Sequence, residues 1–191
     1  LHLRNICMVD GTPTLFDAIE FNDAFSTIDV LYDLAFVLMD LNHLGLGRLA
    51  NILFNRYFDN TGEGEEHLDG LRVMALFLSM RAAIRAHVDI SQAESLSDVA
   101  QAKRRAGEAA DYLHSAISVM TPPSPRLIAV GGLSGSGKSR MARELAPHIG
   151  SAGAALGARV VRSDSTRKRL AGVAWTARLG AEGYTPEMTE R

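Results

Sequence analysis

The stretch RLIAVGGLSGSGKS, residues 126–139, decides how the second part of this chain is expected to fold. A short apolar run at 126–131 leads into a loop rich in glycine and serine, and residues 132–139 fit the pattern G-x-x-x-x-G-K-[ST] without a mismatch. Glycines in such a loop adopt positive φ and bring backbone N–H groups close to phosphate oxygens. The pattern therefore predicts a phosphate-binding loop made of Gly132, Leu133, Ser134, Gly135, Ser136, Gly137, Lys138 and Ser139.

Two side chains of this loop carry specific roles in the pattern. Lys138 would reach the β- and γ-phosphates of ATP, and the hydroxyl of Ser139 would be a ligand of Mg²⁺. The following helix would point its N-terminus, with its partial positive charge, at the same phosphates. ATP and Mg²⁺ are thus the expected cofactors. The structural alternative is a flexible glycine–serine linker, which does not explain the apolar run before it.

The residues around the loop predict an α/β order. The run 126–131 reads as a strand, 139–148 as a helix, 159–161 as a second strand, and a further helix begins at Asp164, with Asp164 as its cap. Strand, loop, helix, strand and helix in this order predict a parallel α/β unit. A parallel sheet buried on both faces needs more than two strands, so the unit is expected to be incomplete.

The first 120 residues predict a different architecture. A short turn and strand at 12–21 precede apolar residues at helical spacing, which predict four helices. These cover about 28–41, starting from a cap at Ser26 or Thr27, then 48–58, 67–88 and much of 96–119. We therefore expect a mixed fold, with a mainly helical part followed by an incomplete α/β domain.

A proline-rich segment separates the two parts. Residues 121–125 contain three prolines, which favour an extended connector. The charge balance changes sign there, from a net charge of −8 over residues 1–121 to +6 over 122–191. The predicted domains are 1–120, a linker at 121–125, and 126–191.

Composition excludes several classes of protein. A single cysteine excludes a disulfide scaffold, and no apolar stretch reaches the ~20 residues that would span a bilayer. No signal peptide is found, so a cytoplasmic location is expected.

A net charge of −2 gives no reason to expect nucleic acid, and the expected partners are a nucleotide and a small-molecule substrate. The chain begins without Met and stops inside the predicted α/β unit, so we expect a fragment; its oligomeric state is left open.

Residues 127–184 resemble P-loop small-molecule kinases, especially the zeta-toxin-like and gluconate-kinase-like groups. Two features carry this resemblance: the loop at 132–139 and the segment RSDSTRKRL at 162–170, after the second predicted strand. The resemblance implies Asp164 as the general base that faces an acceptor hydroxyl, and Arg162, Arg167 and Arg169 as contacts to substrate or phosphate. The alternatives are a simple helix cap for Asp164 and a solvated helix face for the basic residues. The Walker B carboxylate and the lid of such kinases lie outside the chain, so the fragment alone is expected to be inactive.

The opening residues LHLRN, 1–5, resemble the end of the catalytic loop of the aminoglycoside-phosphotransferase family, whose fold is kinase-like. The segments LFDAIEFND, 15–23, and DVLYDLA, 29–35, continue this likeness. The resemblance implies that Asn5 and Glu20 bind a metal ion and that Asp29 and Asp33 occupy structural positions. The alternative is that Asn5 and Glu20 are ordinary polar residues of a turn and a strand.

Together the two resemblances follow the order of a bifunctional aminoglycoside-phosphotransferase-like/ATP-binding protein. They imply transfer of the γ-phosphate of ATP to a small-molecule hydroxyl. One alternative function is a nucleotide-binding regulatory module without phosphotransfer. Another is a toxin-like kinase that acts on a nucleotide-sugar.

Overall fold

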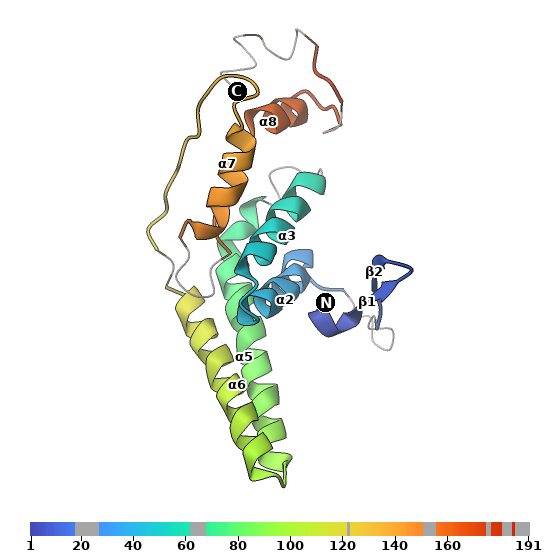
Figure 1. The fold of residues 1–191 in the computed structure, drawn as a ribbon, viewed down its shortest axis with the longest axis vertical. Coiled ribbons are helices and arrows are strands. Elements are labelled where there is room, and N and C mark those ends of the chain that lie inside the picture. Colours follow the sequence, from blue (N-terminus) through green and yellow to red (C-terminus); the bar gives the residue numbers. More distant parts are fainter. Residues whose placement is uncertain are drawn as a thin grey trace.

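The structure is a computed structural model that describes residues 1–17, 27–61, 68–121, 123–150, 156–174, 177–180 and 185. Within these ranges the chain is mainly helical, with six α-helices, two short 3₁₀ helices and one two-stranded sheet (Figure 1). The elements are η1 (Leu3–Asn5), β1 (Ile6–Val9), β2 (Thr12–Leu15), α2 (Val30–His43), α3 (Gly47–Asn60), α5 (Leu71–Ser95), α6 (Val99–Val119), α7 (Lys138–Leu145), η2 (Ala146–His148) and α8 (Ser163–Leu170).

The parallel α/β unit predicted for residues 126–191 is wrong. The sheet found in the described ranges is antiparallel and lies in the first 15 residues. The apolar runs at 126–131 and 159–161 are extended, but neither pairs with a strand in the described part of the chain. A strand needs a neighbour for its backbone groups, and an apolar run cannot supply one by itself. Residues 158–160 bond instead to side chains of α3 and to η2.

Strands β1 and β2 form a hairpin at the N-terminal end. Ile6 pairs with Leu15 and Val9 with Thr12, so two residues, Asp10 and Gly11, make the turn. Both have positive φ, of 49° and 77°, as a type I′ turn requires. Helix η1 precedes the hairpin and is tied to α2, because the N–H of Leu3 donates to Asp40 at 3.1 Å.

Helix α2 is the centre of the hydrophobic core. Asp29 caps it by accepting a hydrogen bond from the N–H of Leu31 at 2.7 Å, so the cap is Asp29 and not the predicted Ser26 or Thr27. Its buried side chains contact α3, α5 and α6. These side chains are Leu31, Leu34, Ala35, Val37, Leu38, Met39 and Leu41. A helix that is apolar over most of its surface must be covered on several sides, and α2 is.

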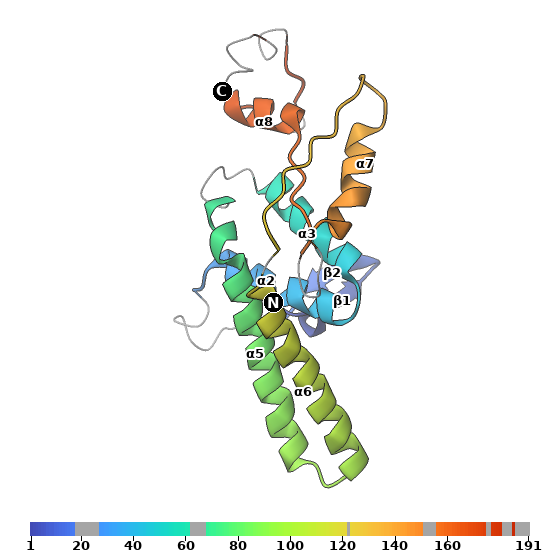
Figure 2. The same ribbon diagram turned by 90° about the vertical axis from the view of Figure 1, so that its left-hand side faces the viewer.

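Helices α5 and α6 form a long antiparallel hairpin that extends from the core as an arm (Figures 1 and 2). Small buried residues let the two backbones approach closely, among them Ala82, Ala86, Ala93, Ala109 and Ala116. One charged side chain is buried there as well: Asp89 is 1% exposed and pairs with Arg105 at 3.2 Å. No helix in the described ranges is both long enough and apolar enough to cross a membrane.

Helices α7 and α8 lie at the opposite end of the molecule from this arm (Figure 1). The chain reaches them through the extended residues 123–131 and returns to α3 at 156–160. Helix α3 therefore lies between the helical core and the glycine-rich loop that precedes α7.

Candidate functional site

The loop at 132–139 has the backbone that its glycines allow. Gly132, Gly135 and Gly137 have φ values of 149°, 77° and 85°. A Cβ atom on Gly132 would lie 2.9 Å from the hydroxyl oxygen of Ser136, which is too close for an unshifted contact. Gly137 is the residue before α7, so its left-handed conformation turns the chain into the helix. The loop is thus a defined turn and not an extended linker.

Lys138 folds back over this loop. Its Nζ donates a hydrogen bond to the backbone carbonyl of Leu133, and the N–H of Ser136 donates to the same carbonyl at 3.2 Å. The ammonium group is held by a neutral acceptor, and a phosphate brought into the loop could take that acceptor's place.

A cavity of about 650 Å³ brings this loop together with the start of α8. Four residues of the loop line it, namely Ser134, Gly135, Lys138 and Ser139. Arg162, Ser163 and Asp164 line it too, as do apolar residues of the segments 127–130 and 158–161. The other loop residues, Gly132, Leu133, Ser136 and Gly137, do not line it. Lys138 and Asp164, 26 positions apart along the chain, therefore line one cavity.

Asp164 is the second residue of α8 and not its cap. The residue before the helix is Arg162, which makes no side-chain capping bond. The Asp164 carboxylate lies 3.1 Å from Nζ of Lys168 and 3.8 Å from the guanidinium of Arg162, and its side chain is 41% exposed. The carboxylate is thus exposed enough to be reached by a small molecule while two cations lie beside it.

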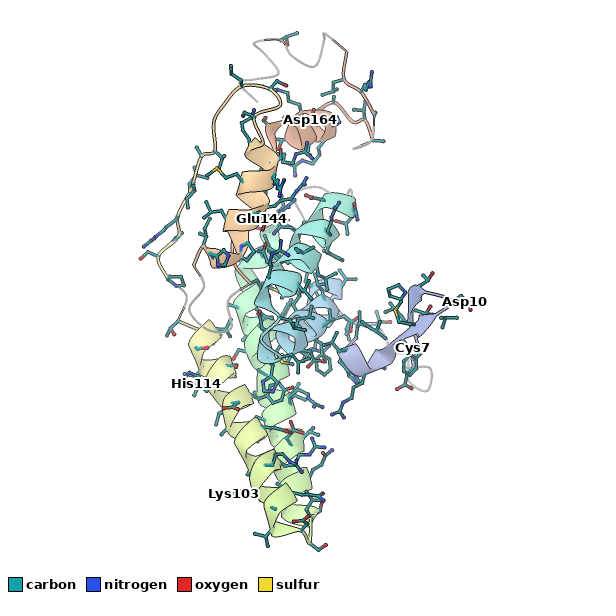
Figure 3. All side chains as sticks on the ribbon, in the orientation of Figure 1. Cys7, Asp10, Lys103, His114, Glu144 and Asp164 are labelled. Carbon is teal, nitrogen blue, oxygen red and sulfur yellow. The ribbon has the colours of Figure 1, made fainter. Side chains whose placement is uncertain are left out.

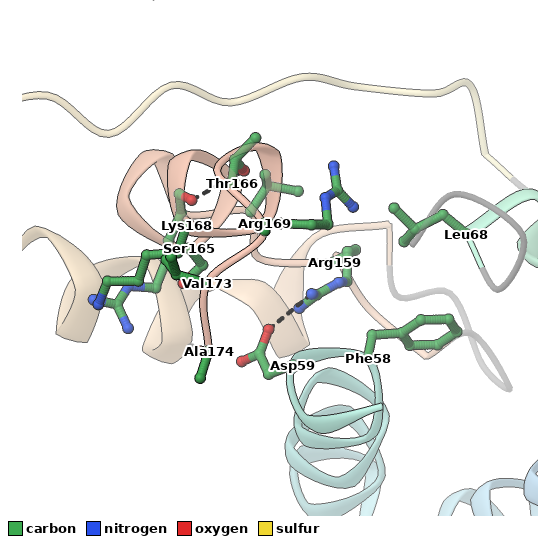
Figure 4. Close-up of a pocket in the computed structure, with 13 residues that line it drawn as sticks. Phe58, Asp59, Leu68, Arg159, Ser165, Thr166, Lys168, Arg169, Val173 and Ala174 are labelled. Atoms are coloured by element: carbon green, nitrogen blue, oxygen red, sulfur yellow. Dashed lines mark hydrogen bonds and ion pairs between the residues drawn. The ribbon is translucent and has the colours of Figure 1, made fainter. Parts of the chain in front are cut away.

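A second cavity, of about 430 Å³, lies beside α8 (Figure 4). Its charged lining is mainly basic and consists of Arg159, Arg162, Lys168, Arg169 and Asp59. Arg159 and Arg162 line both cavities. Figure 4 shows Arg159 between α8 and the side chains of Phe58 and Leu68, bonded to Asp59 at 2.7 Å. Of the three arginines predicted from the sequence, Arg162 and Arg169 face this cavity, and Arg167 lines neither one.

Sequence reasoning missed Arg159 and Lys168. Arg159 was placed in a predicted strand, and Lys168 was grouped with the basic helix face. The available signal was spacing: Lys168 lies four residues after Asp164, which puts both on one face of a helix.

Asn5 lies in a second polar cluster, near the N-terminal hairpin. Its Nδ2 donates to the backbone carbonyls of Phe16 and Asp17, at 3.3 and 3.2 Å, and lies 3.3 Å from the Asp17 carboxylate. Its Oδ1 is buried and has no hydrogen-bond partner, and Asp17 has a φ of 62°. An amide oxygen and a carboxylate are suitable ligands for a hard cation. Glu20, the predicted partner of Asn5, lies outside the described residues.

Asp17 is the residue that sequence reasoning missed at this cluster. No local signal marks it, because its contact is with Asn5, 12 positions earlier. In the described ranges no group of three His, Cys, Asp or Glu side chains could hold a metal ion. The remaining ligands of a bound cation would have to come from water or a nucleotide.

The other acidic and histidine positions near α2 have structural contacts. Asp29 caps α2, and Asp33 lies 4.0 Å from the guanidinium of Arg81. His2 packs edge-on against Phe36, and burial lowers the pKa of its imidazole. A neutral His2 accepts a hydrogen bond from the N–H of Arg4 at 3.1 Å, which agrees with a structural role.

Comparison with known proteins finds relatives without an assigned activity. No protein-family model matches the chain, and no solved structure matches it. It is similar to the uncharacterized proteins Mb2027c of Mycobacterium bovis and MT2060 and Rv2004c of Mycobacterium tuberculosis. Each is 31% identical over 167 residues, which cover 87% of this chain and 30% of the relative. The chain thus spans about 30% of the length of these curated relatives.

Proposed function

We propose that the loop at 132–139 binds ATP with Mg²⁺ and that the whole protein transfers the γ-phosphate to a small-molecule hydroxyl. The observation that carries this proposal is the cavity shared by Lys138, Ser139 and Asp164. Phosphoryl transfer needs a cradle for the phosphates, neutralisation of their charge and a carboxylate near the attacking hydroxyl. Four residues of the loop, with the Lys138 ammonium among them, and the Asp164 carboxylate line this one cavity and would supply these three requirements.

Each residue has a distinct role in the proposed reaction. Backbone N–H groups of the loop and the Lys138 ammonium would hold the β- and γ-phosphates, and the Ser139 hydroxyl would bind Mg²⁺, which neutralises phosphate charge. Asp164 would orient the acceptor hydroxyl and take its proton. The new bond joins the acceptor oxygen to the γ-phosphorus, the bond from that phosphorus to the β–γ bridging oxygen breaks, and ADP leaves.

The basic cavity beside α8 suggests the chemical class of the acceptor. Four cations line this cavity, and two carboxylates lie near them: Asp59 pairs with Arg159, and Asp164, outside the lining, is near Lys168 and Arg162. A ligand with a carboxylate or phosphate group would compensate this charge. Arg162 also lines the cavity of about 650 Å³, which we call the nucleotide cavity. It could therefore bind the anionic group of the acceptor and keep the acceptor close to the γ-phosphate.

ATP binding is the first test of this proposal. Calorimetry with Mg²⁺ should give micromolar binding that Lys138→Ala weakens about 10- to 100-fold, because a hydrogen bond to a charged group is lost. Lys103→Ala is the matched control, since Lys103 is an exposed lysine on the distant arm (Figure 3). Absence of binding in the wild-type protein, or equal binding by Lys138→Ala, would refute the assignment of the loop.

A nucleotide-dependent regulatory module is the second candidate function. This candidate is favoured by the ion pair between Arg48 of α3 and Glu144 of α7, at 2.9 Å. The pair links α7, the helix that follows the loop, to the helical core, so a nucleotide in the loop could affect this contact. The two functions differ in turnover. ADP production by the full-length protein that depends on an added acceptor, and that Asp164→Asn abolishes, would support the kinase; tight binding without such turnover would support the module.

A further inference from the structure

One face of α3 carries a row of polar residues that all contact the second half of the chain. We define this docking stripe as Arg48, Asn51, Asn55 and Asp59. The spacing of three, four and four residues places them on one side of a helix. Each of them bonds to a residue between 144 and 160, about 100 positions later in the sequence.

Asn51 fixes the first part of the extended segment 156–160. It is 2% exposed, and its Nδ2 donates to the carbonyls of Leu156 and Ala158 at 2.7 and 3.1 Å. The buried carbonyl of Leu156 is satisfied in this way, and the half-buried carbonyl of Ala158 receives one of its two donors.

Asn55 fixes the next part of the same segment. Its Oδ1 accepts from the N–H of Val160 at 2.8 Å and from the guanidinium of Arg159 at 3.0 Å. Its Nδ2 donates to the carbonyl of Ala158 at 3.1 Å. A side-chain amide that donates and accepts in this way takes the place of the neighbouring strand that the segment lacks.

Gly157 shows how closely the segment is packed. It has a φ of 75°, and a Cβ atom there would lie 2.6 Å from the carbonyl oxygen of Ala146 and 2.8 Å from Nδ2 of Asn51. The next residue is bonded on the same side, because the N–H of Ala158 donates to the Ala146 carbonyl at 2.8 Å. The segment is therefore held between α3 and η2, with no space for a side chain at position 157.

The same segment is a wall of the nucleotide cavity. Ala158, Arg159 and Val160 line that cavity, and Arg162 and Asp164 follow directly in the sequence. Another wall is α7, which α3 also holds, through Arg48 and Glu144; Figure 3 shows Glu144 on α7 toward α3.

We propose that Asn51 and Asn55 are positioning residues of the nucleotide cavity: by fixing the segment 156–160 against α3, they hold Arg162 and Asp164 at the phosphate loop. The proposal rests on the proposed function, because it concerns the same cavity. Neither asparagine lines that cavity, so both act through the backbone that they bind. Coupling between two equilibria is reciprocal. If docking of the segment on α3 strengthens nucleotide binding, then a bound nucleotide must strengthen this docking by the same factor.

Asn55→Leu in the full-length protein tests this role. Leucine preserves the volume and removes the bonds to Val160 and Ala158, so we expect ATP·Mg²⁺ to bind about tenfold more weakly in calorimetry. Hydrogen exchange of the Val160 N–H should become faster, and saturating ATP should slow it again. Asn60→Leu is the matched control, since Asn60 is exposed at the end of α3, and it should leave both readouts unchanged.

A conservative variant separates positioning from packing. Asn55→Asp keeps an acceptor for Val160 N–H and Arg159, but it turns a second oxygen toward the Ala158 carbonyl in place of the Nδ2 donor. ATP affinity should therefore fall less than in Asn55→Leu, because the bonds to Val160 and Arg159 are kept. If Asn55→Leu does not fold, Gly157→Ala replaces it, because the added methyl group must displace the segment. Gly45→Ala is its control: Gly45 has a similar φ of 74° but nothing within 4 Å of its Cβ position.

The outcomes are distinct. Wild-type ATP affinity in Asn55→Leu and Gly157→Ala would overturn the positioning role and leave the proposed function intact. An effect of Asn60→Leu equal to that of Asn55→Leu would overturn it as well. A wild-type protein that binds no ATP would instead overturn the proposed function, and this inference with it.

Discussion

Gly132 shows how one residue sets the shape of the candidate site. Its φ of 149° lies where residues with a side chain are rarely found, and its Cβ position is 2.9 Å from the Ser136 hydroxyl oxygen. The preceding Gly131 has open space around its Cβ position and an ordinary φ. Gly132 is therefore under a conformational constraint that Gly131, just before the loop, does not have, and composition alone does not reveal this difference.

Gly132→Ala should distort the loop, whereas Gly131→Ala should be tolerated. The backbone strain should cost about 1–3 kcal/mol in unfolding free energy and weaken ATP binding in calorimetry. Gly131→Ala is the matched control and should change neither quantity by much. If both variants bound ATP as the wild type does, the conformation of Gly132 would have no part in phosphate binding.

The turned conformation of the loop at 132–139 could be predicted at the level of residues because all its glycines are contiguous with the helix that follows. Gly132 to Ser139 adopt a turned backbone that leads into a helix, as their pattern requires. Asp17 and Arg159 could not be predicted, because their roles come from Asn5 and Asp59, which lie 12 and 100 positions away. No local pattern records such a pairing.

In the α5–α6 arm, too, the role of a residue depends on a partner in another element. Asp89 of α5 is almost fully buried, is bonded to Arg105 of α6, and lies 3.8 Å from Arg85. One of its carboxylate oxygens has no hydrogen-bond partner. The carboxylate compensates positive charge on both helices, and removal of one partner of such a buried pair leaves the other charges uncompensated.

Asp89→Ala should destabilise the protein by about 3 kcal/mol, because it leaves the two arginines without their shared carboxylate. Urea unfolding followed by circular dichroism measures this change. Glu94→Ala is the control on the same helix, since Glu94 is exposed, and it should stay within about 0.5 kcal/mol of the wild type. A loss of less than 1 kcal/mol in Asp89→Ala would contradict this role for the buried carboxylate.

Helices were easier to predict than strands in this chain, for a physical reason. The regions predicted as helices at 48–58 and 96–119 correspond to α3 and α6, because a helix bonds within itself and its apolar spacing is local. The region predicted at 67–88 corresponds to part of α5, which continues to Ser95. The strands predicted at 126–131 and 159–161 are only extended chain, because the bonds that define a strand come from elsewhere in the molecule.

At the scale of the whole molecule, α3 joins the two halves that composition and charge separate. The first half is acidic and the second basic, and Arg48 with Glu144 and Asp59 with Arg159 bond across them at 2.9 and 2.7 Å. Hydrogen bonds from Arg48 lower the pKa of the Glu144 carboxyl below its ordinary value. This one ion pair between the halves is therefore expected to weaken in acid.

A lowered pKa in the folded state stabilises the protein above the ordinary pKa of glutamate, and this stabilisation is lost as the pH falls through the lowered value. Wild type should thus be more stable than Glu144→Gln at neutral pH, and the difference should disappear on acidification from about pH 4.3 downward. Thermal unfolding across this range measures it. High salt should reduce the difference, because the pair is exposed. A difference that grew as the pH fell would contradict the ion pair.

The docking stripe also bears on how the chain is made. Asn51 and its acceptor on Leu156 are separated by 105 residues, so a ribosome that adds about 5–20 residues per second would complete α3 roughly 5–20 s before its partner exists. During that interval the face of α3 is open to other chains. Before the partner segment is made, the amide and charged groups can form hydrogen bonds with water. An apolar face of the same size would favour aggregation. The polar character of the stripe thus suits a surface that must remain soluble first and be buried later.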